Sequence, residues 1–406
     1  MNAHDAVERA YRAEWTRVVA TLIRTVGDWD LAEECAQEAF AQAVRRWPED
    51  GVPDRPGAWL TTTARNRAVD VLRREAVGAA KLRQVAVFQQ EDPHEIVDDR
   101  LRLIFTCCHP ALALEARVAL TLRAVAGLTT AEIARAFLVP EAAMSKRITR
   151  AKGKIRDAGI PYRVPSAETL PARMTAVLGV VYLLFNEGYS DREVLSAEAI
   201  RLARMLVELL PDEPEPAGLL ALLLLHEARR PGRFVDGDLV LLDDQDRSIW
   251  DSSAIADGLS LLDKTLLIGR PGPYQVQAAI AACHATAKTA AETDWPQIAA
   301  LYGTLSLMLP SPVVTLNRAV AVAMVRGPAA GLDLLDGVDL PGYHLLPATR
   351  ADLLTRLGRV DEAAEAYRAA LALAPTEPER RFLSARLVRL GAARSSSGGQ
   401  LPKGPP

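Results

Sequence analysis

The stretch Gly127-Leu-Thr-Thr-Ala-Glu-Ile-Ala-Arg-Ala-Phe-Leu-Val-Pro-Glu-Ala-Ala-Met-Ser-Lys-Arg-Ile-Thr-Arg-Ala-Lys152 decides the local fold. Thr129 or Thr130 can cap a short first helix, and Glu132 is close enough to complete a capping box. Pro140 suits the start of a second helix, where its missing N–H has little effect. At helical spacing we expect four buried residues in that second helix: Met144, Ile148, Ala151 and Ile155. The stretch therefore predicts a helix-turn-helix.

The opposite face of the second helix combines small and basic residues. Between Lys146 and Arg156 the chain carries six cations and no acid. Small side chains allow close approach to the major groove, where Lys, Arg, Ser and Thr can donate to base edges, and further cations can contact phosphates. We expect DNA contacts from Ser145, Lys146, Arg147, Thr149, Arg150, Lys152 and Lys154. A solvated basic face on an ordinary helical hairpin is the alternative interpretation.

Composition narrows the class of protein around this motif. The chain has 406 residues, a net charge of −3, 49% hydrophobic and 24% charged residues, which is a globular balance. Four cysteines are too few for a disulfide scaffold and favour a reducing cytoplasm. The polar N-terminus lacks a signal-peptide core, and the most apolar stretch, 218–225, is too short to span a membrane. We expect a cytoplasmic protein with no membrane contact.

The charge is unevenly distributed along the chain. Residues 1–156 contain 24 Lys and Arg against 21 Asp and Glu, whereas residues 157–406 contain 24 against 30. A basic first part and an acidic second part place any nucleic-acid surface in the first part.

Periodicity predicts an all-α protein, because helical spacing occurs almost everywhere and strand-like alternation is nearly absent. A polar stretch and a proline-rich stretch divide the helical pattern, and the end of the chain is rich in Ser, Gly and Pro. We expect helical domains at 1–83, 96–158 and 173–391, linkers at 84–95 and 159–172, and a disordered tail at 392–406.

Two helices are predicted in the first block. In the stretch from Asp30 to Phe40, helical spacing puts a core face at Ala32, Ala36, Phe40, Ala43 and Val44. The outer face is acidic and polar, formed by Asp30, Glu33, Glu34, Gln37 and Glu38. Taken without its context, such a face is more often a solvated helix surface.

The stretch from Ala58 to Arg74 forms the second helix, with Leu60, Ala64, Ala68 and Val71 facing inward. Its other side carries Trp59, Thr62, Asn66, Asp70 and Arg73, flanked by Arg65, Arg67 and Arg74. An exposed polar stripe bordered by arginines suits contact with an opened DNA strand.

Taken in order along the chain, these three patterns resemble the extracytoplasmic-function group of the bacterial sigma-70 family. The resemblance covers residues 5–158. It implies that the acidic face docks on the largest subunit of core RNA polymerase and that the helix-turn-helix binds the −35 promoter element. It also implies that the arginine-bordered helix contacts the −10 element and the opened non-template strand through Trp59, Thr62, Arg65, Asn66, Asp70, Arg73 and Arg74.

Two details qualify that −10 assignment. Thr62 and Asp70 carry no positive charge, although the resemblance places them beside a phosphate-rich strand. The resemblance also implies that the loop from about Trp47 to Pro56 would hold a base turned out of the duplex. Contacts in a pocket would offset the free energy of unstacking that base. Trp47 and Trp59 could stack on bases, but a Trp in a small helical domain is more often part of its core.

The remaining chain contains a repeat-like pattern. Residues 347–375 match one tetratricopeptide repeat of about 34 residues, 318–335 resemble a degraded copy, and 295–310 are a candidate third copy. Such repeats stack into a concave surface that binds a protein or peptide. The whole chain, including the segments 183–190 and 241–251, resembles a sigma-factor subgroup with a fused helical repeat-like domain. That resemblance implies regulation in cis.

No cofactor, metal site or enzymatic centre is expected. Cys107-Cys108-His109 fits a buried helical turn better than a metal site, since adjacent cysteines rarely bind one tetrahedral ion. Asp243, Asp244 and Asp246 lack the glycine and closing Glu of a calcium loop and suit helix capping. There is no glycine-rich phosphate loop and no convincing pair of nucleophile and base.

We therefore predict a sigma factor that directs core RNA polymerase to −35/−10 promoters and is regulated by its extension. The main alternative is a repeat-containing helix-turn-helix regulator that binds DNA without joining polymerase. A second alternative, an enzyme with an appended DNA-binding domain, needs a polar cluster within 173–390, and none is visible.

Overall fold

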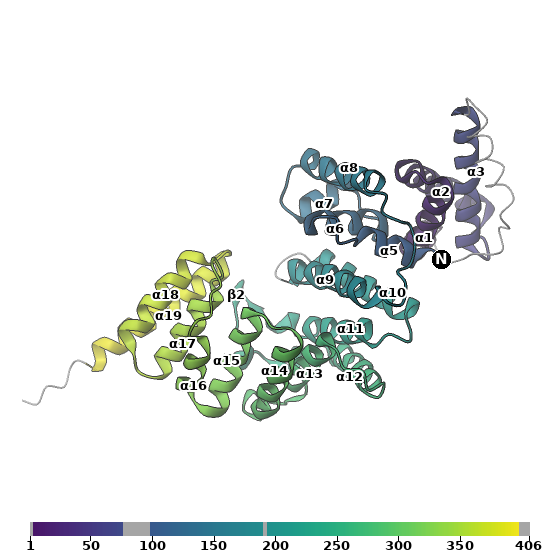
Figure 1. Ribbon diagram of the computed structural model, residues 1–406. Helices are drawn as coiled ribbons and strands as arrows, with labels where there is room; N and C mark the ends of the chain where they lie inside the picture. The colour runs from purple at the N-terminus through teal and green to yellow at the C-terminus, as the bar shows by residue number, and fades with distance from the viewer. Residues whose placement is uncertain (1–2, 76–97, 190–192, 398–406) are drawn as a thin grey trace, which may run out of the picture. The chain divides into compact units, whose positions relative to one another are not determined.

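The computed structural model describes residues 3–75, 98–189 and 193–397, and these are almost entirely helical (Figure 1). The all-α prediction is confirmed. The chain divides into two compact units, 1–202 and 203–406. The predicted linker at 84–95 lies outside the described residues.

Three long helices open the first unit: α1 (Ala3–Val26), α2 (Trp29–Asp50) and α3 (Pro56–Glu75). Asp28 caps α2, because its carboxylate accepts hydrogen bonds from the backbone N–H groups of Asp30 and Leu31. The predicted core of α2 is confirmed at Ala32, Ala36, Phe40 and Ala43. It is wrong at Val44, which lies at the edge of the buried stripe and is 45% exposed.

The domain that contains the helix-turn-helix follows in the same unit. Its elements are α5 (Arg100–Cys107), α6 (Leu114–Leu120), the π-helical turn η1 (Thr121–Val125), and the two helices of the motif, α7 (Thr130–Ala136) and α8 (Glu141–Asp157). Thr129 and Glu132 form the predicted capping box at the start of α7. Pro140 occupies the N-cap of α8, and the predicted buried face of α8 is confirmed at Met144, Ile148, Ala151 and Ile155.

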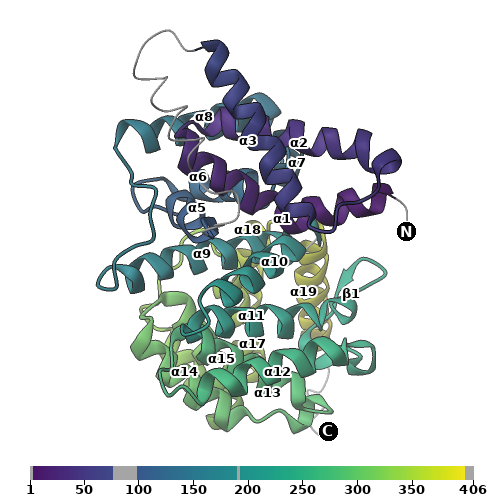
Figure 2. The ribbon, with the colours of Figure 1, turned by 90° about the vertical axis from the view of Figure 1, so that its right-hand side faces the viewer.

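The next helix, α9 (Leu170–Tyr189), packs against α5 and α6 (Figure 2). The Arg173 guanidinium on α9 donates to the carbonyl of Phe105 on α5. Arg201 on α10 (Glu193–Leu209) donates to the carbonyl of Val125. The extension expected from residue 173 therefore contributes its first helix to the unit that holds the helix-turn-helix.

The second unit begins with α11 (Pro214–Glu227), whose residues 218–225 are all buried. Those leucines form part of a buried helical core. A short hairpin follows, with β1 (Phe234–Val235) antiparallel to β2 (Asp238–Leu239). The connecting elements and helices are η2 (Arg230–Gly232), η3 (Leu242–Asp244), η4 (Arg247–Ile249), α12 (Ser252–Leu266), α13 (Pro273–Thr286), η5 (Ala290–Glu292) and α14 (Trp295–Met308).

Helix pairs occur at two of the three predicted copies, whereas the candidate third copy, 295–310, holds the single helix α14. The pairs are α15 (Pro312–Arg326) with α16 (Pro328–Leu335), and α17 (Leu345–Arg356) with α18 (Val360–Leu373). Gly358 turns the chain between α17 and α18 with φ +74°, a conformation that favours glycine. The small or apolar repeat positions Ala351, Leu354, Ala363, Tyr367 and Ala370 share one buried cluster.

The last helix, α19 (Glu377–Ser397), corrects one prediction. Composition predicts disorder from residue 392, but the helix continues through 392–397. Helical backbone hydrogen bonding propagates one residue at a time once a helix is formed, so a serine-rich end can continue it. The rest of the predicted tail, 398–406, lies outside the described residues.

Candidate nucleic-acid interface

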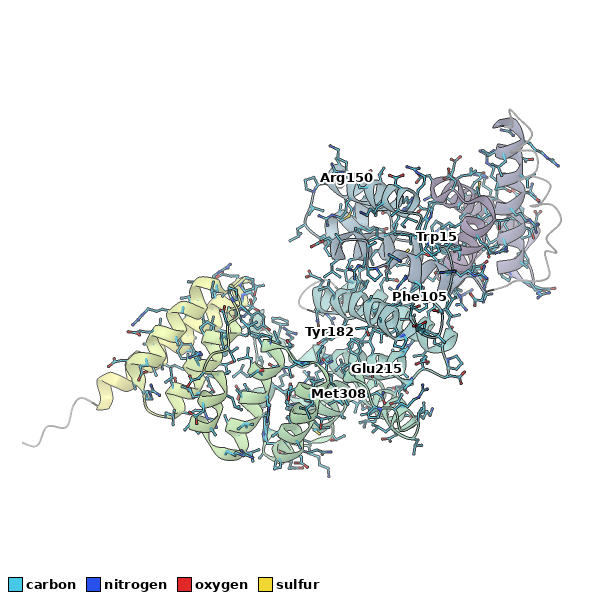
Figure 3. The ribbon with its side chains drawn as sticks, in the orientation of Figure 1. Trp15, Phe105, Arg150, Tyr182, Glu215 and Met308 are labelled. Carbon is cyan, nitrogen blue, oxygen red and sulfur yellow. The ribbon has the colours of Figure 1, made fainter. Side chains whose placement is uncertain are left out.

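A cationic groove runs along α8. It has a volume of about 650 Å³ and is bordered by α8 and by the start of α6. Four of its lining residues are cations and none is acidic: Lys146, Arg147, Arg150 and Lys154. Figure 3 shows Arg150 on α8, in the same unit as Trp15 and Phe105. The groove therefore joins positive charge to a helix presented by a helix-turn-helix, a combination suited to the DNA major groove.

The predicted −35 residues do not all have the same exposure. Five of them are exposed on α8 and one, Arg147, is half-buried: the exposed set is Ser145, Lys146, Thr149, Arg150 and Lys154. Lys152 differs, because only 11% of its side chain is exposed and its ammonium lies 2.8 Å from carboxylates of Asp30 and Glu33 on α2. In this structure Lys152 thus contacts α2 and not the groove.

The opposite wall of the groove was not predicted from the sequence. It is formed largely by small residues at and before the start of α6, namely Ala111, Leu112, Ala113 and Ala116. Small side chains at this wall leave room for a partner to approach α8. The three alanines between 111 and 116, at positions 111, 113 and 116, are the signal that could have identified this wall.

The predicted −10 helix is α3, and its exposed stripe matches the expected spacing. Thr62, Asn66, Asp70, Arg73 and Arg74 are exposed, whereas Trp59 and Arg65 are half-buried. The buried side of α3 is confirmed at Leu60, Ala64 and Ala68.

The expected base-holding loop needs a correction. α2 continues through Pro48 to Asp50, so the segment between α2 and α3 spans only 51–55. Trp47 is 2% exposed and its ring meets that of Trp59 edge-on, at 5.7 Å between centroids. Trp47 therefore belongs to the core that α2 and α3 share, where it buries a large apolar surface. The stacking role considered for Trp47 is not available in this conformation.

The acidic face of α2 is only partly exposed. Asp30, Glu34 and Gln37 are exposed, and Glu38 is half-buried and lies 2.8 Å from Arg45. Glu33 was predicted on the outer face, but only 6% of its side chain is exposed, since η1 and α8 supply Arg123 and Lys152 at 2.8 Å each. A carboxylate at this depth needs such cationic partners.

Two adjacent buried cysteines lie close to this interface. Burial raises the pKa of the Cys107 thiol well above its ordinary value and that of Cys108 to about 11. Both thiols therefore stay protonated near neutral pH and suit packing. Among residues 3–75, 98–189 and 193–397, no cluster of three or more His, Cys, Asp or Glu side chains could hold a metal ion. Within the same ranges, every helix is too short or too polar to cross a membrane.

One unit thus combines a helix-turn-helix that has a cationic groove, an arginine-bordered helix and an acidic helix. This combination defines the class of promoter-reading proteins. Family comparisons agree with this class. Residues 10–77 match sigma-70 region 2, and residues 102–155 match sigma-70 region 4. The chain belongs to the extracytoplasmic-function group of the sigma-70 family and carries a C-terminal extension. Membership implies core RNA polymerase and promoter DNA as its partners.

The extension is matched separately. Residues 173–266 match a family of unknown function, DUF6596. The uncharacterized protein R00370 of Rhizobium meliloti is 45% identical over 396 residues, which cover 93% of this chain and 94% of that protein. The sigma-like part and the extension therefore occur together in a second protein.

Named sigma factors match over shorter ranges. The probable ECF RNA polymerase sigma factor SigI of Mycobacterium tuberculosis is 27% identical over 177 residues, 41% of this chain and 60% of SigI. SigK of Mycobacterium ulcerans is 27% identical over 162 residues, 38% of this chain and 82% of SigK. No solved structure matches the chain.

Proposed function

We propose that this sigma factor directs core RNA polymerase to −35/−10 promoters, reads the −35 element through α8 and the −10 element through α3, and is regulated in cis by its extension. The observation that carries the promoter reading is the acid-free groove of four cations on α8. Its charge attracts the phosphate backbone, while Ser145 and Thr149 supply uncharged donors beside it. The chain positions polymerase and leaves the chemistry of RNA synthesis to it.

Docking on polymerase is assigned to the exposed part of the acidic face of α2. Gln37 is exposed, and Glu34 and Glu38 carry only solvent-accessible ion pairs, Glu34 with Arg67 at 3.7 Å and Glu38 with Arg45 at 2.8 Å. Solvent-exposed ion pairs of this kind are weak, so Glu38 can exchange its partner. Reversing the charge of Glu34 and Glu38 tests the docking directly.

Regulation by the extension is supported by the packing of α9 on the DNA-binding domain. A cavity of about 240 Å³ is lined by α6, Phe137 and α8 on one side and by α9 on the other. Met144 and Arg147 of α8 and Leu183 and Glu187 of α9 line that same cavity. A movement of α9 therefore changes the packing behind the helix that we assign to the −35 element. A peptide or protein bound by the helix pairs α15–α18 is the proposed source of such a movement.

The test is promoter-specific transcription in vitro with purified core polymerase, comparing the full chain with two variants. Glu34→Lys combined with Glu38→Lys should abolish specific transcript while leaving binding to a −35 duplex intact. Arg173→Ala removes the hydrogen bond from α9 to Phe105 and should change transcript yield at least twofold: a rise means that the extension restrains activity, and a fall means that it supports activity.

The matched control is Arg204→Ala on α10, since Arg204 is exposed. An Arg173→Ala yield equal to that of the control contradicts regulation through α9. Specific DNA binding without transcript from any form of the chain contradicts promoter direction of polymerase and favours a DNA-binding regulator.

A further inference from the structure

The two sigma domains are packed directly against each other within the first unit. Three side chains of α1 donate to backbone carbonyls at and after η1: Tyr11 to Gly127 at 2.7 Å, Trp15 to Ala124 at 3.2 Å and Thr16 to Val125 at 2.6 Å. Trp15 and Thr16 are both buried. This neutral contact joins the first three helices to the helix-turn-helix and gives the charged contact beside it a fixed geometry.

The charged contact is a cluster of two acids and two bases. Glu33 on α2 lies 2.8 Å from Arg123 on η1 and 2.8 Å from Lys152 on α8, and Lys152 also lies 2.8 Å from Asp30. The exposed fractions of the Glu33, Lys152 and Arg123 side chains are 6%, 11% and 14%. Arg123 is held further by a hydrogen bond to the carbonyl of Leu128.

Two of these residues belong to surfaces that the sequence predicts to bind an outside partner. Glu33 belongs to the predicted acidic docking face of α2, and Lys152 belongs to the predicted DNA-contacting residues of α8. In the packed arrangement each neutralises the other, so neither is available to its outside partner. A buried charge that loses one partner needs another, which polymerase and a DNA phosphate can each supply.

We propose that the Glu33–Lys152–Arg123 cluster, with Asp30, is a latch that holds the two sigma domains together in the free chain and opens when polymerase binds. Only the identity of the opening partner rests on the proposed function; the closed state of the free chain does not. Polymerase shifts the chain to the open state only if it binds that state more strongly than the closed state. A new ion pair between Glu33 and polymerase, formed only in the open state, provides this difference in affinity. Weakening the latch should therefore raise the apparent affinity for polymerase.

The first experiment measures closure in the full chain without polymerase. Dyes are attached at Glu49→Cys on α2 and Glu141→Cys on α8, both exposed positions, with Cys283→Ser removing the one native cysteine that is not buried. Single-molecule energy transfer should show one closed population for the parent chain. Lys152→Gln should add a population with lower transfer.

The matched control for this measurement is Arg156→Gln, which removes one positive charge from α8. Arg156 is 82% exposed and its ion pair is with the adjacent Asp157 at 3.4 Å. Equal transfer in Lys152→Gln and the control overturns the latch. A second test variant with its own control distinguishes opening from misfolding. Glu33→Gln should open the chain and Glu34→Gln should not, and circular dichroism checks that all variants are folded. Opening by Glu34→Gln as well overturns the latch.

The second experiment measures binding to core polymerase. Lys152→Gln should bind about 3- to 10-fold more tightly than the parent chain, and Arg156→Gln within twofold of it. Tighter binding restricted to Lys152→Gln supports the link to polymerase, and equal affinities contradict it. If no form of the chain binds polymerase, the proposed function fails, whereas the energy-transfer result still decides whether the latch exists.

Discussion

At the scale of single residues, neighbouring cations on α8 have different environments. Lys154 and Arg150 are exposed and line the groove, whereas Lys152 points toward the carboxylates of α2. The helical rotation of about 100° per residue separates them: a step of two residues turns a side chain by more than half a circle. The basic run in the sequence therefore contains two sets of cations: one lines the groove, and the other contacts the carboxylates of α2.

This difference predicts distinct effects on DNA binding. Arg150→Ala should weaken binding to the correct −35 duplex by about 1–3 kcal/mol and relax the preference for that sequence, because a base contact is lost. Lys154→Ala should weaken binding to all duplexes alike and lower the salt slope by about 1, because a phosphate contact is lost. Fluorescence anisotropy at several salt concentrations, with matched and scrambled −35 duplexes, measures both effects. Identical behaviour of the two variants argues against the proposed orientation of α8.

At the scale of elements, the start of α7 is fixed by a reciprocal pair of hydrogen bonds. The Thr129 hydroxyl accepts from the Glu132 N–H at 3.2 Å, and the Glu132 carboxylate accepts from the Thr129 N–H at 2.7 Å. The backbone hydrogen bond from Thr129, followed by the hydroxyl, lowers the pKa of Glu132. Because this pKa is lowered on folding, its contribution to stability is present above the pKa of the unfolded chain and is lost as pH falls through the folded pKa.

Thr129→Ala should lower the free energy of unfolding by about 1 kcal/mol, the usual loss of an N-cap. Urea unfolding monitored on the first unit measures this, with Thr130→Ala as control because Thr130 is already inside the helix. The difference between the two variants should shrink in acid, as pH falls through the lowered pKa of Glu132 and this carboxylate becomes protonated. A constant difference in the free energy of unfolding from pH 7 to pH 3 would show that Glu132 takes no part in capping α7.

The elements were the most predictable level of this protein. The spacing of Met144, Ile148, Ala151 and Ile155 predicted the buried face of α8 because a helix must turn its apolar side inward. Val44 was misplaced because packing between helices, not spacing within one, decides which side chain at the edge of a stripe is covered. The pairing of Glu33 with Lys152 was missed for the same reason, because it joins residues that are distant in the chain.

At the scale of the whole molecule, the sequence located the sigma-like domains and the repeat pairs but not the place of α9. The compact division falls after residue 202, within α10, and not at the proline-rich stretch 159–172. Prolines mark where the chain leaves a helix, and carry no information about which domain the next helix packs on. α9 and Arg201 together attach the beginning of the extension to the helix-turn-helix domain.

This attachment predicts how truncated chains behave. A chain ending at Arg163 lacks α9 and therefore uncovers the buried apolar residues Val118 and Ala119 of α6, which line the cavity under α9. A fully buried aliphatic side chain contributes about 1.5–3 kcal/mol, so uncovering Val118 and Ala119 should lower the free energy of unfolding of the first unit by an amount of that order. The chain ending at Arg163 should melt at a lower temperature and bind a hydrophobic dye more strongly than a chain ending at Leu202.

Calorimetry and dye titration on both truncations provide the measurement, with the full chain as reference. Dye binding matters because a loss of helix alone lowers the melting temperature without exposing the α6 surface. Equal melting temperatures and equal dye binding would mean that α9 is dispensable to the first unit. In that case the extension would have to act on the sigma domains through some contact other than α9, and the Arg173→Ala variant should transcribe like the parent chain.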